Sequence, residues 1–183
     1  MRSSQTTYIA SKLGIKAKQP WVYFLLKAFA VLVLLYLIGI WFSSRFLIVG
    51  DPQEVKCLPG YSVYLVDKND QSIERGELYM FLSKDLSPIY SENTKMLKFM
   101  RGLPGDQIEV RSNSQVFING NASEAGLSLA STKLGLSESD FHGKTTLGED
   151  EFWFLGTSPK SFDSRYWGSI HRDKIVGRAY AIF

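Results

Sequence analysis

Two residues of this chain have the types and spacing of an acyl-transfer site. Cys57 is its only cysteine, and Lys98 follows further along the chain. A thiolate attacks carbonyl carbons, and a nearby amine can accept and return the proton that moves. One cysteine cannot form a disulfide within the chain, so Cys57 is inert, reactive or paired with another chain. A charged residue before Cys57 and Leu58, Pro59 and Gly60 after it favour a reactive thiol over a buried, inert one.

Four segments around these residues resemble parts of the type I signal peptidases. Lys98 and the turn at 102–106 (GLPGD) resemble the lysine box of that family, and 161–168 (SFDSRYWG) resembles its C-terminal box. Residues 75–77 (RGE) resemble the strand start between nucleophile and lysine, and 116–120 resemble the stretch after the lysine box. The order and spacing agree over residues 21–183, which favours a common fold.

Within that superfamily, the chain is most similar to the TraF-type peptidases of conjugative transfer systems. Their nucleophilic serine lies in a Lys-Ser-x-Pro segment, and Lys56, Cys57, Leu58 and Pro59 have the same spacing here. The amino-acid sequence of residues 161–166 (SFDSRY) also resembles that branch. The resemblance implies processing of a conjugative prepilin and, in some members, joining of the ends of the pilin into a ring.

The resemblance also assigns roles to individual residues. It implies that Cys57 is the nucleophile in the place of a serine and that Lys98 is the base. The hydroxyl of Ser161 corresponds to one that orients the lysine amine. Asp163 and Arg165 correspond to a structural ion pair. The backbone N–H of Cys57 is the oxyanion donor that can be named.

Three departures from the family pattern concern this site. A thiol replaces the serine hydroxyl at Cys57. Val55 stands where the family often has a hydroxyl that helps to bind the oxyanion, and 156–160 (GTSPK) replaces a more usual Gly-Asp-Asn-Arg-Asp. These departures leave a catalytically inactive scaffold in pilus or transfer assembly as one alternative, and a general signal peptidase as another.

A thiol changes the chemistry that the lysine must perform. Free thiols have a pKa of about 8.5 and lysine amines of about 10.4, so proton transfer from thiol to amine is favourable in water. The acyl-enzyme would be a thioester, which reacts with amines more readily, relative to water, than an oxygen ester does. The sequence therefore favours capture of the acyl group by the amino end of the substrate, while hydrolysis stays open.

Residues 21–42 (WVYFLLKAFAVLVLLYLIGIWF) read as a transmembrane helix. As a helix they span about 33 Å, enough for a hydrocarbon core of about 30 Å. The one charged residue, Lys27, lies near the first end, and Trp21, Tyr23, Trp41 and Phe42 suit the two interfaces. The alternative is a cleaved signal peptide, but the apolar run is long for one and no clear cleavage site follows it.

The flanking charges predict the orientation of this span. Arg2, Lys12, Lys16 and Lys18 precede it without any acidic residue, whereas only Arg45 follows closely. By the positive-inside rule, residues 1–20 form a basic cytoplasmic N-terminus. Residues 43–183 would then be a periplasmic catalytic domain on a single-pass protein of the bacterial inner membrane.

The rest of the chain predicts a mainly antiparallel β domain. Short apolar or alternating runs separated by turns give the following expected strands: 46–49, 61–66, 77–82, 95–101, 107–111, 116–118, 152–155 and 175–183. Residues 121–150 are rich in Ser, Gly and Thr and predict a loop-rich insertion with a short helix near 132–140. His142 and His171 lack partners at metal-ligand spacing, so no metal and no cofactor are expected.

Composition limits the partners. The chain has 183 residues, 45% of them hydrophobic, and a formal net charge of +3, which is too small to indicate nucleic-acid binding. The expected partners are the lipid bilayer and a membrane-anchored pilin precursor. The sequence leaves the oligomeric state open.

Overall fold

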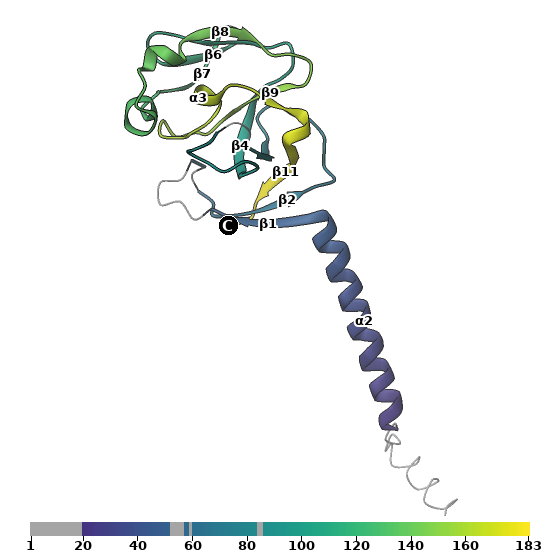
Figure 1. Ribbon diagram of the computed structural model, residues 1–183. Coiled ribbons are helices and arrows are strands. Elements are labelled where there is room, and N and C mark those ends of the chain that lie inside the picture. The colour runs from purple at the N-terminus through teal and green to yellow at the C-terminus, as the bar shows by residue number, and fades with distance from the viewer. Residues whose placement is uncertain (1–19, 52–56, 59, 84–85) are drawn as a thin grey trace, which may run out of the picture. The chain divides into compact units, whose positions relative to one another are not determined.

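The computed structural model describes residues 20–51, 57–58, 60–83 and 86–183, without the side chain of Ala125 (Figure 1). The chain divides into two compact units, Met1–Ser44 and Arg45–Phe183. The positions used above to orient the span, Arg2 to Lys18, lie outside the described residues. So do Val55, Lys56 and Pro59.

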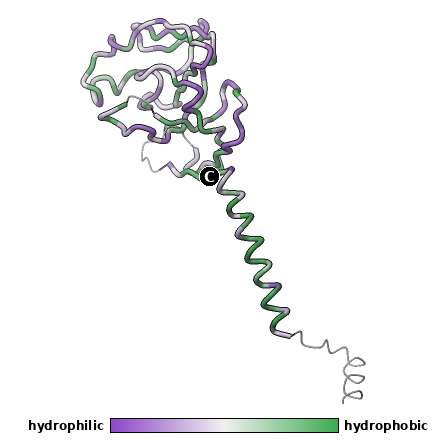
Figure 2. Tube along the Cα trace, turned by 45° about the vertical axis from the view of Figure 1, so that its right-hand side comes forward, coloured by the Kyte–Doolittle hydropathy of each residue, from purple (hydrophilic) through white to green (hydrophobic). Residues whose placement is uncertain are grey.

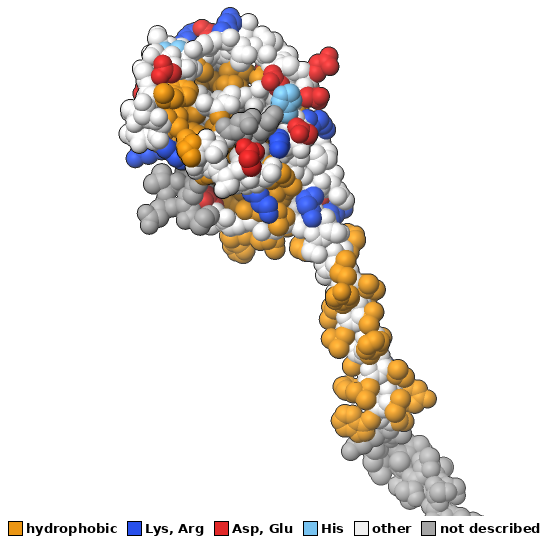
Figure 3. Space-filling view, viewed as in Figure 1, with side chains coloured by type: hydrophobic (Ala, Val, Ile, Leu, Met, Phe, Trp, Pro, Cys, Tyr) orange, Lys and Arg blue, Asp and Glu red, His pale blue; other side chains and the backbone are white. Residues whose placement is uncertain are grey.

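Helix α2, Trp21–Arg45, is long and apolar enough to cross a membrane. Its mean hydropathy is 2.4 over the most apolar stretch, and none of its residues is buried by the rest of the protein. Figure 2 colours most of its described length as hydrophobic, and Figure 3 shows hydrophobic side chains along it. Twenty-five residues give a helix of about 38 Å, so the helix extends three residues beyond the predicted end at Phe42.

The second unit is built from short strands and a few helical turns. The strands are β1 Phe46–Gly50, β2 Val63–Asp67, β3 Leu78–Leu82, β4 Lys95–Gly102, β5 Gln107–Val110, β6 Gln115–Ile118, β7 Asn121–Ala125, β8 Gly143–Thr146, β9 Glu151–Leu155, β10 Ile170–His171 and β11 Ile175–Ala181. The helical segments are η1 Ala130–Leu134, η2 Glu138–Phe141, α3 Ser164–Trp167 and η3 Arg172–Lys174.

Two antiparallel sheets form the domain. The larger has the strand order β1-β2-β11-β3-β4-β9-β10, and the smaller has the order β7-β6-β5-β8. Every pair of neighbouring strands in the described residues is antiparallel. The prediction of a mainly antiparallel β domain is therefore confirmed.

Three groups of buried side chains hold the sheets. One lies around the small sheet and includes Ile108, Val116 and Trp153. The other two lie around the large sheet, one with Tyr79, Phe81 and Phe154 and one with Leu58, Tyr64 and Met80. Strand β3 contributes to both of these groups because alternate side chains of a strand point to opposite faces.

The large sheet is closely packed at Gly102, the last residue of β4, which pairs with Trp153 of β9. A Cβ atom there would lie 2.7 Å from the Cβ of Trp153 and 2.9 Å from Leu147 Cδ1. No larger residue fits without displacing this packing. The glycine that opens the GLPGD turn is thus required by close contact between β4 and β9.

Residues 121–150 hold more regular structure than the sequence predicted. Strands β7 and β8 lie at the two edges of the small sheet. In place of one helix near 132–140 there are a π-helical turn, η1, and a 3₁₀ turn, η2. Gly135 adopts a left-handed conformation (φ 65°) directly after η1, which ends that turn and separates it from η2.

Candidate active site

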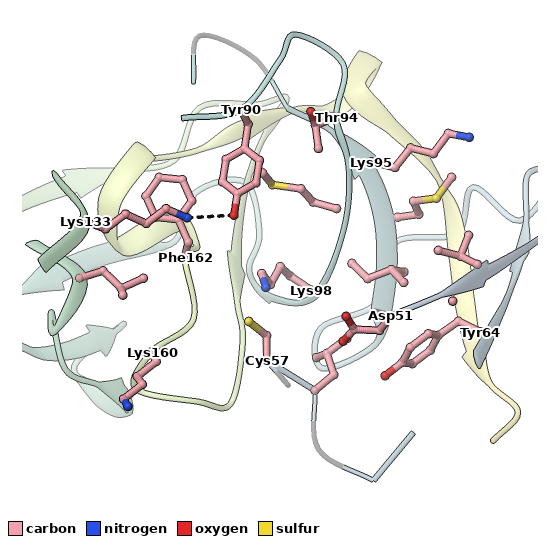
Figure 4. A pocket seen from close by; sticks show the side chains of 17 residues that line it. Asp51, Cys57, Tyr64, Tyr90, Thr94, Lys95, Lys98, Lys133, Lys160 and Phe162 are labelled. Carbon is pink, nitrogen blue, oxygen red and sulfur yellow. Dashed lines mark hydrogen bonds between the residues drawn. The ribbon is translucent and has the colours of Figure 1, made fainter. Parts of the chain in front are cut away.

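A pocket of about 500 Å³ in the second unit contains both residues singled out for acyl transfer. Cys57 and Lys98 both line it, and Figure 4 shows the thiol and the amine pointing toward one another. Apolar side chains such as Leu58, Met80 and Leu97 make up much of the wall. The pocket therefore brings a thiol and an amine together in largely apolar surroundings.

Strand β4 positions Lys98 in the interior of the large sheet. The strand pairs with β3, where Tyr79 is opposite Lys98, and with β9 on its other side. Lys98 is only 7% exposed, and its neighbours Leu97 and Phe99 pack against a buried cluster. Among the described residues, none forms an ion pair or a hydrogen bond with its amine. A buried amine without a carboxylate is an unusual group that suits a reactive role.

Cys57 is fixed by the residue after it and by the chain after β9. The side chain of Leu58 is buried in the cluster of Tyr64 and Met80. The carbonyl of Cys57 accepts hydrogen bonds from the Thr157 N–H at 3.1 Å and from Thr157 Oγ1 at 3.2 Å. Thr157 lies in the segment that departs from the family pattern, and no sequence signal indicated this role.

Ser161, expected to orient the lysine amine, is fully buried next to Gly156. A Cβ atom at Gly156 would lie 2.2 Å from Ser161 Oγ and 3.2 Å from the Cys57 carbonyl oxygen. Ser161 therefore lies close to the nucleophile's backbone. Its hydroxyl has no hydrogen-bond partner in the described part of the chain, and it does not line the pocket. The hydrogen bond expected from Ser161 to Lys98 is thus not formed here.

The structure brings Asp163 and Arg165 together as a buried pair. Arg165 Nε and Nη2 donate to the two carboxylate oxygens of Asp163, each at 2.7 Å. The guanidinium also donates to the carbonyls of Gly126, Ser158 and Ser161 at 2.8, 3.1 and 3.3 Å. Burial alone would lower the pKa of Arg165, but the hydrogen bond to Asp163 raises it. The pair holds the chain around Ser161 in place.

Asp106 joins three of the segments that resembled signal peptidases. Arg75 donates to its carboxylate at 2.6 and 3.1 Å, and Asn119 Nδ2 donates at 2.7 Å. The N–H of Leu103 donates to it at 2.7 Å, which closes the GLPGD turn. Burial alone would raise the pKa of Asp106, but these donors lower it below its usual value. These segments hold the end of β4 and do not line the pocket.

A second set of side chains lines the pocket opposite Cys57. Lys133 Nζ, from η1, donates to the hydroxyl of Tyr90 at 3.0 Å (Figure 4). The same amine lies 4.5 Å from the Tyr90 ring centre and 4.7 Å from that of Phe162. Phe162 belongs to the SFDSRYWG segment, whereas Tyr90 and Lys133 come from loop-rich segments in which no motif marks them.

The described residues contain no group of three or more His, Cys, Asp or Glu side chains placed to hold a metal ion. His171 is exposed and lies 3.8 Å from Glu151, and His142 lies after η2. Neither histidine lines the pocket of Cys57. The arrangement supports nucleophilic attack by a thiol with an amine as proton carrier.

The family model and the similar proteins found by comparison are all signal peptidases. Residues 21–183 match the family described as signal peptidase, peptidase S26. A probable signal peptidase I-2 of Synechocystis sp. is 31% identical over 111 residues, which cover 60% of this chain and 48% of that protein. A signal peptidase I of Leptolyngbya laminosa is 31% identical over 115 residues, which cover 60% of this chain and 52% of that protein. The matched region thus spans about half the length of these relatives.

Among solved structures, a signal peptidase I from Enterococcus faecalis V583 is 24% identical. That match covers 60% of this chain and 98% of the other, with a TM-score of 0.39.

Proposed function

Because the chain belongs to the signal peptidase family, peptidase S26, we propose that it is a membrane-anchored endopeptidase with a Cys57/Lys98 pair. The observation that carries the proposal is the shared pocket, in which the thiol and the amine point toward one another. The apolar side chains around the pair would lower the local dielectric constant and so strengthen the interactions within it.

The proposed reaction begins with transfer of the thiol proton to the Lys98 amine. The sulfur attacks the scissile carbonyl and forms a tetrahedral intermediate whose oxyanion accepts a hydrogen bond from the Cys57 N–H. The C–N bond then breaks, and the Lys98 ammonium gives its proton to the departing amine. The product is a thioester on Cys57, and the lysine is neutral again.

A second nucleophile completes the cycle. Water, deprotonated by Lys98, would release an acid, whereas a substrate amino group would form a new amide bond. In both cases the C–S bond breaks and the thiol regains its proton from Lys98. Because thioesters favour amines over water, we propose that ring closure of the substrate competes with hydrolysis.

Thr157 supports the oxyanion site through the backbone of Cys57. Its N–H and hydroxyl both hold the Cys57 carbonyl, which fixes the orientation of the peptide group that follows the nucleophile. We propose that this contact compensates for the absence of a hydroxyl at Val55. A rigid donor is worth more than a mobile one because it needs no reorganisation during the reaction.

The proposed substrate is the precursor of a conjugative pilin. Support comes from two segments that resemble the TraF branch. They are the Lys-Cys-x-Pro spacing of Lys56 to Pro59 and the sequence SFDSRY of residues 161–166. Helix α2 would retain the enzyme in the bacterial inner membrane, with residues 1–20 in the cytoplasm and the catalytic domain in the periplasm. A membrane-anchored precursor would then meet the enzyme on the same surface.

General signal-peptide cleavage is the second candidate, and the names of the two 31% identical relatives favour it. A deletion strain separates the two functions. Accumulation of one pilin precursor alone supports the pilin-specific enzyme, whereas accumulation of many preproteins supports the general one.

The test of the Cys57/Lys98 pair uses the full-length chain in membranes. We expect Cys57→Ala and Lys98→Ala to stop precursor processing, while Lys144→Ala, an exposed lysine on β8, leaves it unchanged. Processing that continues in both variants would overturn the enzyme and favour an inactive scaffold. With Cys57→Ser, mass spectrometry of the pilin should show a smaller share of cyclic product. An unchanged ratio of cyclic to linear pilin would contradict the thioester argument.

A further inference from the structure

The charges around the Cys57 pocket are strongly unbalanced. The described residues that line it include four lysines and a single carboxylate, that of Asp51. The lysines are Lys95, Lys98, Lys133 and Lys160. Among the described residues, none of the four forms an ion pair. The pocket therefore offers positive charge to whatever enters it.

Lys133 is the lysine best placed to contact an entering group. Figure 4 shows its amine at the pocket beside the Tyr90 hydroxyl, whereas the amines of Lys95 and Lys160 extend away from Cys57. The hydrogen bond to Tyr90 and the two ring contacts with Tyr90 and Phe162 restrict the Lys133 side chain before any ligand binds. Such preorganisation reduces the entropy that binding costs.

The Lys133 ammonium still has donors to offer. An ammonium group has three N–H donors, and the Tyr90 hydroxyl takes one of them. The ring faces attract its charge without neutralising it. A carboxylate is the group that would use both the remaining donors and the charge.

We propose that Lys133, held by Tyr90 and Phe162, forms a subsite that binds a carboxylate of the substrate beside Cys57. Lys95 and Lys160 add positive potential at the rim. The subsite rests on the proposed peptidase function for its role, since it would select substrate segments that carry a negative charge near the scissile bond. Its charge preference can be measured without any cleavage.

The single cysteine makes a direct measurement feasible. Iodoacetate and iodoacetamide alkylate a thiol by the same displacement of iodide and differ in a carboxylate against an amide. The rate constants for labelling of Cys57 in the full-length protein, in a nonionic detergent, can be followed by intact-mass spectrometry. The quantity of interest is the ratio of the iodoacetate rate to the iodoacetamide rate. This ratio cancels changes in the intrinsic reactivity of the thiol.

We expect Lys133→Gln to lower this ratio about threefold, and Lys133→Arg to retain it, because only the former removes a charge close to the pocket. Lys144→Gln, a loss of charge on exposed β8, is the matched control and should leave the ratio unchanged. Salt at about 0.5 M should reduce the difference between wild type and Lys133→Gln. An unchanged ratio in Lys133→Gln, or equal slowing by both reagents, would overturn the subsite.

Three peptides then separate the sources of the carboxylate. The end-blocked acetyl-Ala-Glu-Ala-amide has a side-chain carboxylate, acetyl-Ala-Gln-Ala has only a terminal one, and acetyl-Ala-Gln-Ala-amide has none. The subsite is supported if either acidic peptide protects Cys57 from iodoacetamide better than the neutral one, and if Lys133→Gln removes that advantage. Protection by vesicles of anionic phospholipid, with none from the acidic peptides, would assign Lys133 to lipid and overturn the proposal. Processing that fails while the labelling ratio holds would refute the peptidase and leave the subsite standing.

Discussion

Lys98 and Arg165 are both buried basic side chains of the same domain, but their surroundings differ. Arg165 is 2% exposed and shares two hydrogen bonds with the Asp163 carboxylate as well as three with backbone carbonyls. Lys98 is 7% exposed and has no ion pair or hydrogen bond from its side chain among the described residues. Each donor of the arginine is used to hold the chain, whereas the amine of the lysine stays available.

This difference distinguishes a basic group that holds the fold together, Arg165, from one that is available for chemistry, Lys98. A buried polar group without a partner lowers the stability of the fold, so a fold keeps one only where it serves another purpose. A buried charge in a complete network stabilises one local conformation and reacts with nothing. We therefore expect loss of Lys98 to lower activity without lowering stability. Disruption of the Arg165 pair should instead lower stability.

The largest expected effect is on catalysis. Lys98→Met should reduce precursor processing by about 10³-fold, because the proton carrier is lost. The free energy of unfolding should stay the same or rise, since an apolar side chain of similar length replaces a buried amine without a partner. Processing assays in membranes and urea denaturation followed by tryptophan fluorescence measure the two quantities. A large loss of stability in this variant would mean that Lys98 has a structural role like that of Arg165.

The next effect concerns the partner of Arg165. Asp163→Ala leaves the guanidinium buried with only carbonyl acceptors, which should lower the free energy of unfolding by about 3–5 kcal/mol. Urea denaturation in mild detergent measures this loss. Lys144→Ala on the exposed face of β8 serves as the control. If Asp163→Ala unfolds at the same urea concentration as wild type, the pair does not hold the fold.

The stability that Asp106 contributes should depend on pH, and Asp106→Asn tests this dependence. Its donors lower its pKa in the folded state, so its stabilisation is present above the unfolded value of about 3.8 and is lost as pH falls through the folded value. Stability of wild type should thus fall on acidification below about pH 4. In Asp106→Asn, stability should be lower at pH 7 by about 1–3 kcal/mol and should vary less below pH 4. Equal acid sensitivity in both proteins would exclude Asp106 as a contributor.

The smallest effect is expected at the backbone of the nucleophile. Thr157→Val removes the hydroxyl donor to the Cys57 carbonyl and leaves the N–H donor, so processing should fall about two- to fivefold. Thr157→Ser keeps the hydroxyl and should restore the rate. A steady-state assay should place the loss in kcat, because the contact orients the nucleophile and does not touch the substrate. A loss confined to KM would argue against this orienting role.

Much of the large sheet could be predicted from the sequence, because its strands have buried faces. Strand β4 shows why: apolar side chains surround Lys98 on both sides of the strand, and the GLPGD turn marks its end. Strands β7 and β8 could not be predicted in the same way. All four residues of β8 are exposed, so no apolar alternation marks it, and its place comes only from backbone pairing with β5.

The site was predictable to a similar extent. Motifs singled out Cys57 and Lys98, and the structure brings these two side chains into one pocket. No local signal connects Thr157 with Cys57, because the contact joins residues 100 positions apart. The same is true of Lys133 and Tyr90, which are 43 positions apart.

The contact of Thr157 with Cys57 also joins two parts of the chain that are synthesised far apart in time. Strand β11, the last in the chain, inserts between β2 and β3, so the large sheet is complete only after the C-terminal residues have arrived. Pairings of such long sequence separation form late in folding. A chain still being synthesised would therefore contain Cys57 before it contains Thr157, the residue that holds the Cys57 carbonyl.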